Sequence, residues 1–210
     1  MPTFTAGPLG VDFDQIDVGG LAAGQASAMG ATSFVITTGA EQDLFQGSGF
    51  VYGGGLLPTA GVITTITDTI GGQQSFTLDG LNLSTADLNA WVVSDSSEAA
   101  KETLFAGDDV INGSNSADLL RGYGGDDTIN GNDGNDLING GDGNNSIHGG
   151  NGDDVIAVTS GSNYLRGDDG DDHIVGGSGF DDINGNKGND TIDGGPGGND
   201  WLVGGQGDDL

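Results

Sequence analysis

The sequence predicts a mainly all-β protein, in which a parallel β-solenoid follows a small β-rich N-terminal domain with two short helices. Three observations predict this fold class. The second half repeats with a period of nine residues, one position of each repeat is always Ile or Leu, and the first half holds runs of β-branched and aromatic residues separated by glycines. We therefore expect two parts, residues 1–103 and residues 104–210.

The first hundred residues hold the expected elements of the N-terminal domain. Runs rich in β-branched and aromatic residues predict strands at 32–38, 50–52, 62–70 and 73–81. The segment Ser84-Thr85-Ala86-Asp87 has the pattern of a capping box and predicts a short helix that continues through Val93. A second helix is expected over 97–105 and leads directly into the first repeat.

The position of this domain, directly before the repeats, predicts its role. The end of a solenoid exposes backbone hydrogen-bonding groups and an apolar cross-section, so another segment must cover it. We therefore expect residues 1–103 to cap and nucleate the repeats. Trp91, Leu104 and Phe105 are candidates for the contact, and burial of an aromatic side chain inside the domain's own core is an equal alternative.

The second half is organised in units of nine residues. From Leu104 the register holds without slippage to Asp193, and the next unit has one extra residue. The eighth position of each complete unit is occupied by Ile111, Leu120, Ile129, Ile138, Ile147, Ile156, Leu165, Ile174, Ile183, Ile192 and Leu202. Three residues around each of these side chains would form a minimal strand with one side chain inward. Two units would then make one coil, with a strand on each side and a loop at each end.

The sixth position of each unit carries a carboxylate or its amide. The aspartates are Asp109, Asp118, Asp127, Asp136, Asp154, Asp172, Asp181, Asp190, Asp200 and Asp209, and the amides are Asn145 and Asn163. Aspartate supplies the hard anionic oxygen that calcium prefers, and the glycines of each unit allow tight turns whose carbonyl groups point at an ion. The ten aspartates, and more weakly the two asparagines, are therefore the candidate ligands of about eight Ca²⁺ ions.

The loops alternate between the two edges of the expected solenoid. The continuous edge carries Asp118, Asp136, Asp154, Asp172, Asp190 and Asp209, and the interrupted edge carries Asp109, Asp127, Asn145, Asn163, Asp181 and Asp200. Both amides thus fall in neighbouring coils of one edge. The second of their loops, from Val158 to Asn163, also lacks the opening glycines. We expect a calcium site between these two loops to be the weakest or to take no ion, unless the amide oxygens coordinate well enough.

The repeat resembles that of the RTX (repeats-in-toxin) family, whose unit is Gly-Gly-x-Gly-x-Asp-x-apolar-x and is a known calcium-binding solenoid repeat. Good copies are Gly149-Gly150-Asn151-Gly152-Asp153-Asp154-Val155-Ile156 and Gly204-Gly205-Gln206-Gly207-Asp208-Asp209. The resemblance covers about half of the chain. It implies a right-handed parallel β-roll with calcium between the loops of successive coils. It also implies an extracellular protein that leaves a Gram-negative bacterium unfolded, by type I secretion.

Composition limits the other possibilities. Residues 104–210 hold 21 acidic and three basic residues, a net charge of −18, within a chain of net charge −28. Such a charge opposes compaction unless cations neutralise it, and it argues against a nucleic-acid partner. The chain has no cysteine, which excludes disulfides, and no apolar run approaches the 18 residues of a membrane span.

Motifs for other activities are weak or missing. His148 and His173 stand at outward-facing repeat positions, and no zinc-protease, lipase or phosphate-loop motif occurs. We therefore expect no enzyme activity. The segment 80–84 is faintly similar to secreted haem-scavenging proteins, with Tyr52 as a candidate haem ligand, but the first half has no histidine.

Three functional hypotheses follow from the sequence. The first is a secreted structural module whose repeats fold on binding extracellular Ca²⁺, because a thin core and many carboxylates disfavour folding without cations. The second is a calcium-dependent filament or surface-layer protein, in which the last coil stacks head-to-tail on the N-terminal domain of the next copy. The third is a folding or targeting fragment of a larger RTX enzyme or adhesin.

Overall fold

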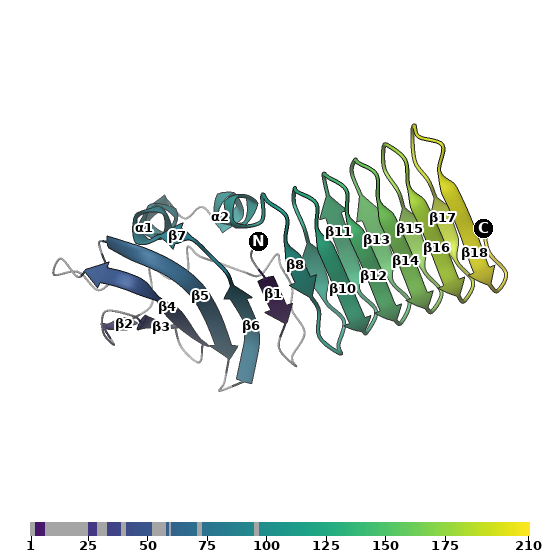
Figure 1. The fold of residues 1–210 in the computed structure, drawn as a ribbon. Coiled ribbons are helices and arrows are strands. Elements are labelled where there is room, and N and C mark those ends of the chain that lie inside the picture. The colour runs from purple at the N-terminus through teal and green to yellow at the C-terminus, as the bar shows by residue number, and fades with distance from the viewer. Residues whose placement is uncertain are drawn as a thin grey trace.

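The computed structural model describes residues 3–6, 25–28, 33–38, 41–51, 58, 60–70, 73–94 and 97–210. These residues form an antiparallel sheet covered by two helices, followed by an elongated stack of flat coils (Figure 1). The coils make a β-solenoid of about five turns over residues 110–206, which confirms the predicted mainly β fold class and the β-roll.

The N-terminal part is a meander of antiparallel strands. Its strands are β1 (Thr3–Ala6), β2 (Gln25–Ala28), β3 (Ser33–Thr38), β4 (Glu41–Val51), β5 (Ala60–Ile70), β6 (Gln73–Asp79) and β7 (Leu83–Ser84). Strands β2 to β6 pair in chain order, and β7 pairs with β5. The helices are α1 (Thr85–Ser94) and α2 (Ser97–Leu104). The Ser84 Oγ accepts the backbone N–H of Asp87 at 3.1 Å, which is the N-terminal cap that the sequence predicts.

Strand β4 is longer than the expected strand at 50–52. The sequence pattern underestimates it because glycines interrupt the strand. The pairing with β5 is irregular between Gln46 and Gly47. A Cβ added at Gly47 would collide with the carbonyl oxygen of Val62, so a glycine is required where the two backbones approach. Tyr52, the candidate haem ligand, lies outside the described residues, and so does the side chain of Trp91.

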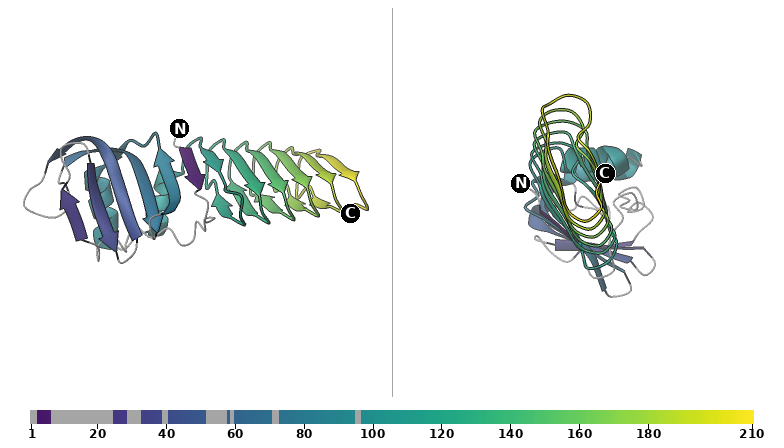
Figure 2. Two further views of the ribbon diagram at one scale, coloured as in Figure 1. Left: turned by 90° about the horizontal axis from the view of Figure 1, so that it is seen from below. Right: turned by 90° about the vertical axis from the view of Figure 1, so that its right-hand side faces the viewer.

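The roll consists of two parallel sheets. Strands β8 (Val110–Asn112), β10 (Thr128–Asp133), β12 (Ser146–Asn151), β14 (Tyr164–Asp169), β16 (Asp182–Lys187) and β18 (Trp201–Gln206) form one side. The other side contains β9 (Leu119–Arg121), β11 (Leu137–Gly141), β13 (Val155–Val158), β15 (His173–Val175) and β17 (Thr191–Asp193). Figure 2 shows the coils superposed as flattened loops when the roll is seen along its length. Five of these strands have six residues, longer than the three that the repeat predicts.

The interior of the roll is the predicted Ile/Leu column. The nine eighth-position side chains from Ile111 to Ile183 are completely buried. The expectation is wrong at the end of the column, where Ile192 is only partly buried and Leu202 is 47% exposed. Strand β18 is the last of its sheet, so Leu202 has a neighbouring strand on one side only.

Strand β1 joins the two parts of the protein, and the sequence did not predict it. It pairs antiparallel with β6 and parallel with β8, so that Phe4 lies opposite Leu78 on one side and Ile111 on the other. Sheet hydrogen bonding therefore continues from the N-terminal strands into the roll, and β1 covers the first edge of the roll. No helix in the described ranges is long and apolar enough to cross a membrane.

The entrance to the first coil is packed with aromatic side chains. Phe105 is 1% exposed, follows α2 directly, and stacks on Tyr123 with ring centroids 6.1 Å apart. Leu104 packs against the same cluster of buried residues. Two of the three residues proposed for the contact with the roll therefore lie at the junction.

Candidate metal sites in the loops

The sixth-position side chains form two hydrogen-bonded ladders, one along each edge of the roll. In each ladder, one side-chain oxygen accepts the backbone N–H of the equivalent residue one coil earlier. Asp154 Oδ1 accepts from Asp136 at 2.8 Å, and Asp172 Oδ1 accepts from Asp154 at 2.9 Å. The ladder fixes the rotamer of each carboxylate that accepts in this way, so the position of its second oxygen is also determined. Asp109, at the start of its ladder, has no hydrogen-bond partner among the described residues at either oxygen.

That second oxygen has no hydrogen-bond partner in most of the loops, although it is buried. Within the described part of the chain, an unpartnered buried Oδ2 occurs at Asp109, Asp127, Asp136, Asp154, Asp172, Asp181 and Asp190. A buried carboxylate oxygen without a donor is costly, and its repetition at one position of a repeat indicates a ligand site.

The first-position glycine of each unit leaves space beside this oxygen. A Cβ added at Gly149 would lie closer than 3.0 Å to both Asp154 Oδ2 and the carbonyl oxygen of Gly167 in the next coil. The same pair of groups, a sixth-position Oδ2 and a first-position carbonyl of the following coil, borders Gly122, Gly131, Gly167 and Gly176. Gly149 has no positive φ. A glycine is therefore needed there for the space between two converging oxygen atoms.

These groups fit calcium. Carboxylate and backbone carbonyl oxygens are the ligands that Ca²⁺ takes in proteins, and each such space receives one of each from two successive coils. A cation held there would supply the positive charge that the buried Oδ2 lacks. It would also tie one coil to the next.

The pKa values of the ladder carboxyls also favour a bound cation. Burial raises the pKa of Asp109, Asp127, Asp154 and Asp172 to about 7, and that of Asp136 to about 6. Burial also raises the pKa values of Asp181 and Asp190. Hydrogen bonds from the backbone counteract the shift, and neighbouring carboxylates add to it, as at Asp154. In their charged form these groups therefore need a nearby cation.

The interrupted edge does not offer this environment at its two amides. Beside Gly140, the space that elsewhere receives a carboxylate and a carbonyl oxygen is approached by Val158 Cγ1, Ile147 Cδ1 and Asn145 Nδ2. Asn163 Nδ2 donates to Asp181 Oδ1 at 2.8 Å. Methyl groups and an N–H donor cannot coordinate a cation, so the residues around Gly140 do not fit calcium.

Asp118 also differs from its equivalents, which the sequence analysis missed. Its Oδ2 accepts the backbone N–H of Ser114 at 2.6 Å and the Ser114 hydroxyl at 3.0 Å. The signal was present in the sequence, because serine replaces glycine at the second position of this unit. At the far end of the roll, Asp200 and Asp209 hold their ladder positions but are less buried than the other sixth-position residues.

The side chains at the fifth position of each unit form a separate series of hydrogen bonds on the surface of the loops. Asp126 N–H donates to Asp108 Oδ1 at 2.9 Å, and Asp171 N–H donates to Asp153 Oδ1 at 3.0 Å. These carboxylates are exposed, unlike their sixth-position neighbours. They orient the loops from outside and provide matched controls for substitutions in the buried ladder.

A comparison with protein families matches the whole roll. Four copies of the family described as RTX calcium-binding nonapeptide repeat cover residues 105–138, 130–165, 166–198 and 175–210, which together are half of the chain. No curated protein and no solved structure matches the chain significantly.

Proposed function

Since the chain belongs to the RTX calcium-binding nonapeptide repeat family, whose repeats bind Ca²⁺ and build β-rolls, we propose that residues 104–210 are a structural module that folds on binding calcium between successive loops. Residues 1–103 serve as its cap. The observation that carries the proposal is the repeated pairing of a buried, unpartnered Asp Oδ2 with a carbonyl oxygen of the next coil beside a first-position glycine.

The ligands in this proposal are the sixth-position aspartates of both edges. Asp127, Asp136, Asp154, Asp172 and Asp181 have the complete environment of orphan carboxylate, converging carbonyl and glycine. Asp109 and Asp190 have the unpartnered oxygen. Asp118 is a weaker candidate because its Oδ2 is bonded to Ser114, and Asp200 and Asp209 are weaker because they are less buried. About eight ions is an upper expectation, because the two amide loops do not contribute.

Calcium would control folding through simple linkage. A ligand that binds only the folded state, at a free concentration tenfold above its Kd, adds about 1.4 kcal/mol per site. Extracellular calcium modules have Kd values of about 10⁻⁴–10⁻³ M, so this term is present outside a cell and absent at submicromolar calcium inside it. The roll would therefore stay unfolded in the cytosol and fold after export. Export by type I secretion is part of this proposal, and immunoblotting of culture medium against cell lysate tests it.

The folding proposal is tested by far-ultraviolet circular dichroism of the full chain in chelator, in magnesium and in calcium. We expect the strand signal to rise on adding calcium but not magnesium, with the N-terminal sheet contributing a constant background. A spectrum that is the same in chelator and in calcium would refute it.

A matched pair of variants locates the ions. Asp154→Asn and Asp153→Asn remove the same charge from adjacent residues, one in the buried ladder and one on the surface. We expect native mass spectrometry to count one calcium fewer for Asp154→Asn and an unchanged count for Asp153→Asn. Equal numbers of bound calcium ions in the two variants would contradict the assignment of the sixth-position aspartates as ligands.

Self-association is a second candidate function, favoured by one observation. Strand β18 exposes Trp201 by 65%, Leu202 by 47% and Val203 by 37%. Apolar side chains gathered on an outer strand favour pairing with a second copy. Because β1 occupies the edge of β8, a head-to-tail contact would have to use another edge of the N-terminal sheet. Light scattering with and without calcium distinguishes this candidate, and monomers under both conditions would eliminate it.

A further inference from the structure

The coil that begins at Gly140 is closed by apolar contact where its neighbours have oxygen atoms. Val158 is only 6% exposed, and its Cγ1 lies with Ile147 Cδ1 beside Gly140. The pairing of β11 with β13 shifts register between Asn139 and Gly141 at this place. The backbone has therefore adjusted to accept a valine side chain inside the loop.

The ladder through this coil is neutral. Asn163 Oδ1 accepts the backbone N–H of Asn145 at 2.9 Å, and Asn163 Nδ2 donates to Asp181 Oδ1 at 2.8 Å. Asn145 Oδ1 in turn accepts the N–H of Asp127 at 3.0 Å. The amides keep the hydrogen bonds of the ladder without its charge, so between Asp127 and Asp181 this edge has no buried sixth-position carboxylate, whereas the opposite edge of the same coils keeps Asp154 and Asp172.

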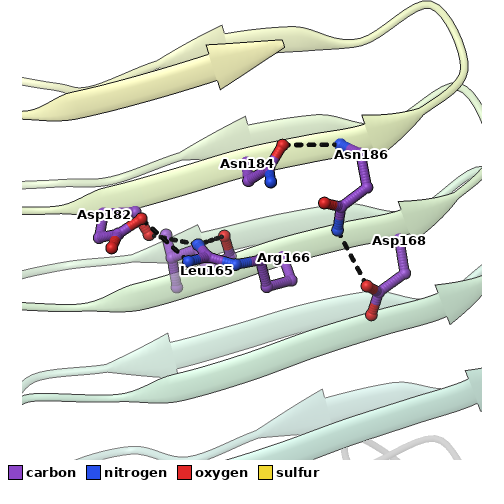
Figure 3. Close-up of polar contacts among 6 residues, drawn as sticks. All are labelled: Leu165, Arg166, Asp168, Asp182, Asn184 and Asn186. Atoms are coloured by element: carbon purple, nitrogen blue, oxygen red, sulfur yellow. Dashed lines mark hydrogen bonds and ion pairs between the residues drawn. The ribbon is translucent and has the colours of Figure 1, made fainter. Parts of the chain in front are cut away.

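The outer face of the same coils carries a network centred on Arg166. Its Nη1 donates to the carbonyl oxygens of Leu165 at 2.8 Å and Asp182 at 2.9 Å, and its Nη2 lies 3.0 Å from Asp182 Oδ1 (Figure 3). The guanidinium carbon lies 3.5 Å from the centroid of the Tyr164 ring, and the Arg166 side chain is only 12% exposed. A largely buried guanidinium with these partners ties β14 to β16 without a metal.

A second tie continues the network across three strands. Asp168 Oδ1 accepts from Asn186 Nδ2 at 2.9 Å (Figure 3). Asp168 Oδ2 lies 2.9 Å from His148 Nδ1. These contacts connect β12, β14 and β16. The polar contacts of Arg166 and His148 thus fall in the coils where the calcium ladder is interrupted.

We propose that residues 140–186 are the segment of the roll that depends least on calcium, and that folding starts there, rather than at residues 1–103 as the sequence predicts, and spreads to the coils on both sides. The inference rests on the proposed function. Its physical basis is that one edge of this segment has valine methyl groups and neutral amides where the flanking coils have unpaired buried carboxylates. The Arg166 network ties the outer face of the same coils without a metal. The cost of burying charge, which calcium offsets elsewhere, is smaller here.

Hydrogen exchange with mass spectrometry on the full chain tests the order directly. Free calcium is stepped from chelated to saturating, and the protection of peptides from 122–139, 140–186 and 187–206 is followed. We expect half-maximal protection of 140–186 at a lower calcium concentration than that of 122–139. The segment 122–139 is the decisive comparison because it lies between the cap and 140–186, so fraying of chain ends cannot lower its protection.

Each outcome decides a different question. If all segments gain protection together, or if 122–139 leads, the inference is overturned and the proposed function remains. If all segments are already protected in chelator, both are overturned. Earlier protection of 140–186 supports both.

Two variant pairs separate the inference from simple differences in local stability. Asn145→Asp combined with Val158→Gly restores the repeat, and we expect one additional calcium ion in native mass spectra and a midpoint for 140–186 shifted up to that of 122–139. Ser162→Asp adds the same charge at an exposed position whose side chain makes no described hydrogen bond, and should leave both unchanged. Arg166→Met should delay protection of 140–186, whereas Lys187→Met, which removes an exposed ion pair with Asp169, should not. An unshifted midpoint in both test variants would contradict the inference.

Discussion

Substitution of Gly149 by alanine probes the space between Asp154 and Gly167. The added methyl group would lie closer than 3.0 Å to the Asp154 carboxylate and to the Gly167 carbonyl, so one of these oxygen atoms must move. Overpacking of this kind costs about 1–3 kcal/mol. The loss of one calcium site at tenfold its Kd costs about 1.4 kcal/mol more. We expect the variant to be about 2–4 kcal/mol less stable in calcium and to bind one ion fewer.

Chemical denaturation in calcium measures this loss, and native mass spectrometry counts the ions. The matched control is Gly124→Ala, because a Cβ at Gly124 would meet nothing within 4 Å and its φ is not positive. A surface substitution without new contacts changes stability by about 0.5 kcal/mol or less. If Gly149→Ala keeps the full calcium count and is as stable as Gly124→Ala, the reasoning about the first-position glycines is refuted.

Three further predictions concern protons, the core and the cap. Burial raises the folded-state pKa of the ladder carboxyls to about 6–7, so the calcium-free roll is stabilised when they are protonated and loses this stability as pH rises through that range. Circular dichroism in chelator should therefore show more strand near pH 5 than near pH 8, and a flat profile would contradict this. Ile156→Ala should cost about 2–5 kcal/mol in calcium-loaded protein and Leu202→Ala much less, since Ile156 is fully buried and Leu202 is half-exposed; equal losses in denaturation curves would argue against the Ile/Leu column as the core. Thr5→Pro removes a backbone donor from β1, and hydrogen exchange should then show earlier opening of β8 than in the unsubstituted protein, whereas unchanged protection of β8 would count against β1 as its cover.

The repeat made most of the roll predictable. Positions six and eight determine which side chains face the loops and which face the interior, and the structure buries Ile111 to Ile183 as this pattern requires. The interruption at Asn145 and Asn163 was also visible as a departure from the repeat. The pattern did not show that the Val158 side chain occupies the space beside Gly140, because this contact depends on where the next coil lies.

The sequence pattern did not predict which strands pair when they lie far apart along the chain. Strand β1 has only four residues, and Phe4 pairs with Leu78 of β6 and Ile111 of β8, about 75 and 107 residues further along the chain. Nothing local in Thr3–Ala6 identifies them. Strand β4 was underestimated because Gly47 is a poor strand former whose role, a close approach to Val62, appears only once β5 lies beside it.

The candidate calcium sites differ from one another for a similar reason. The ten aspartates occupy equivalent positions of the repeat, yet Asp118 Oδ2 is bonded to Ser114, and Asp200 and Asp209 lie in the last coils with less cover. These differences come from neighbours outside the repeat pattern. The repeat therefore predicts where ligands stand, and their surroundings determine how complete each environment is.

In the proposed function, metal ions, and not the thin Ile/Leu column alone, hold the coils together. Equilibrium dialysis of the purified, folded full chain against buffer of about 1–10 mM free calcium, tenfold above the expected Kd, followed by elemental analysis of protein and buffer, measures this most directly. We predict several equivalents of calcium per chain while the fold persists, and unfolding of the roll when a chelator removes them. A fully folded protein that contains no calcium would contradict the account.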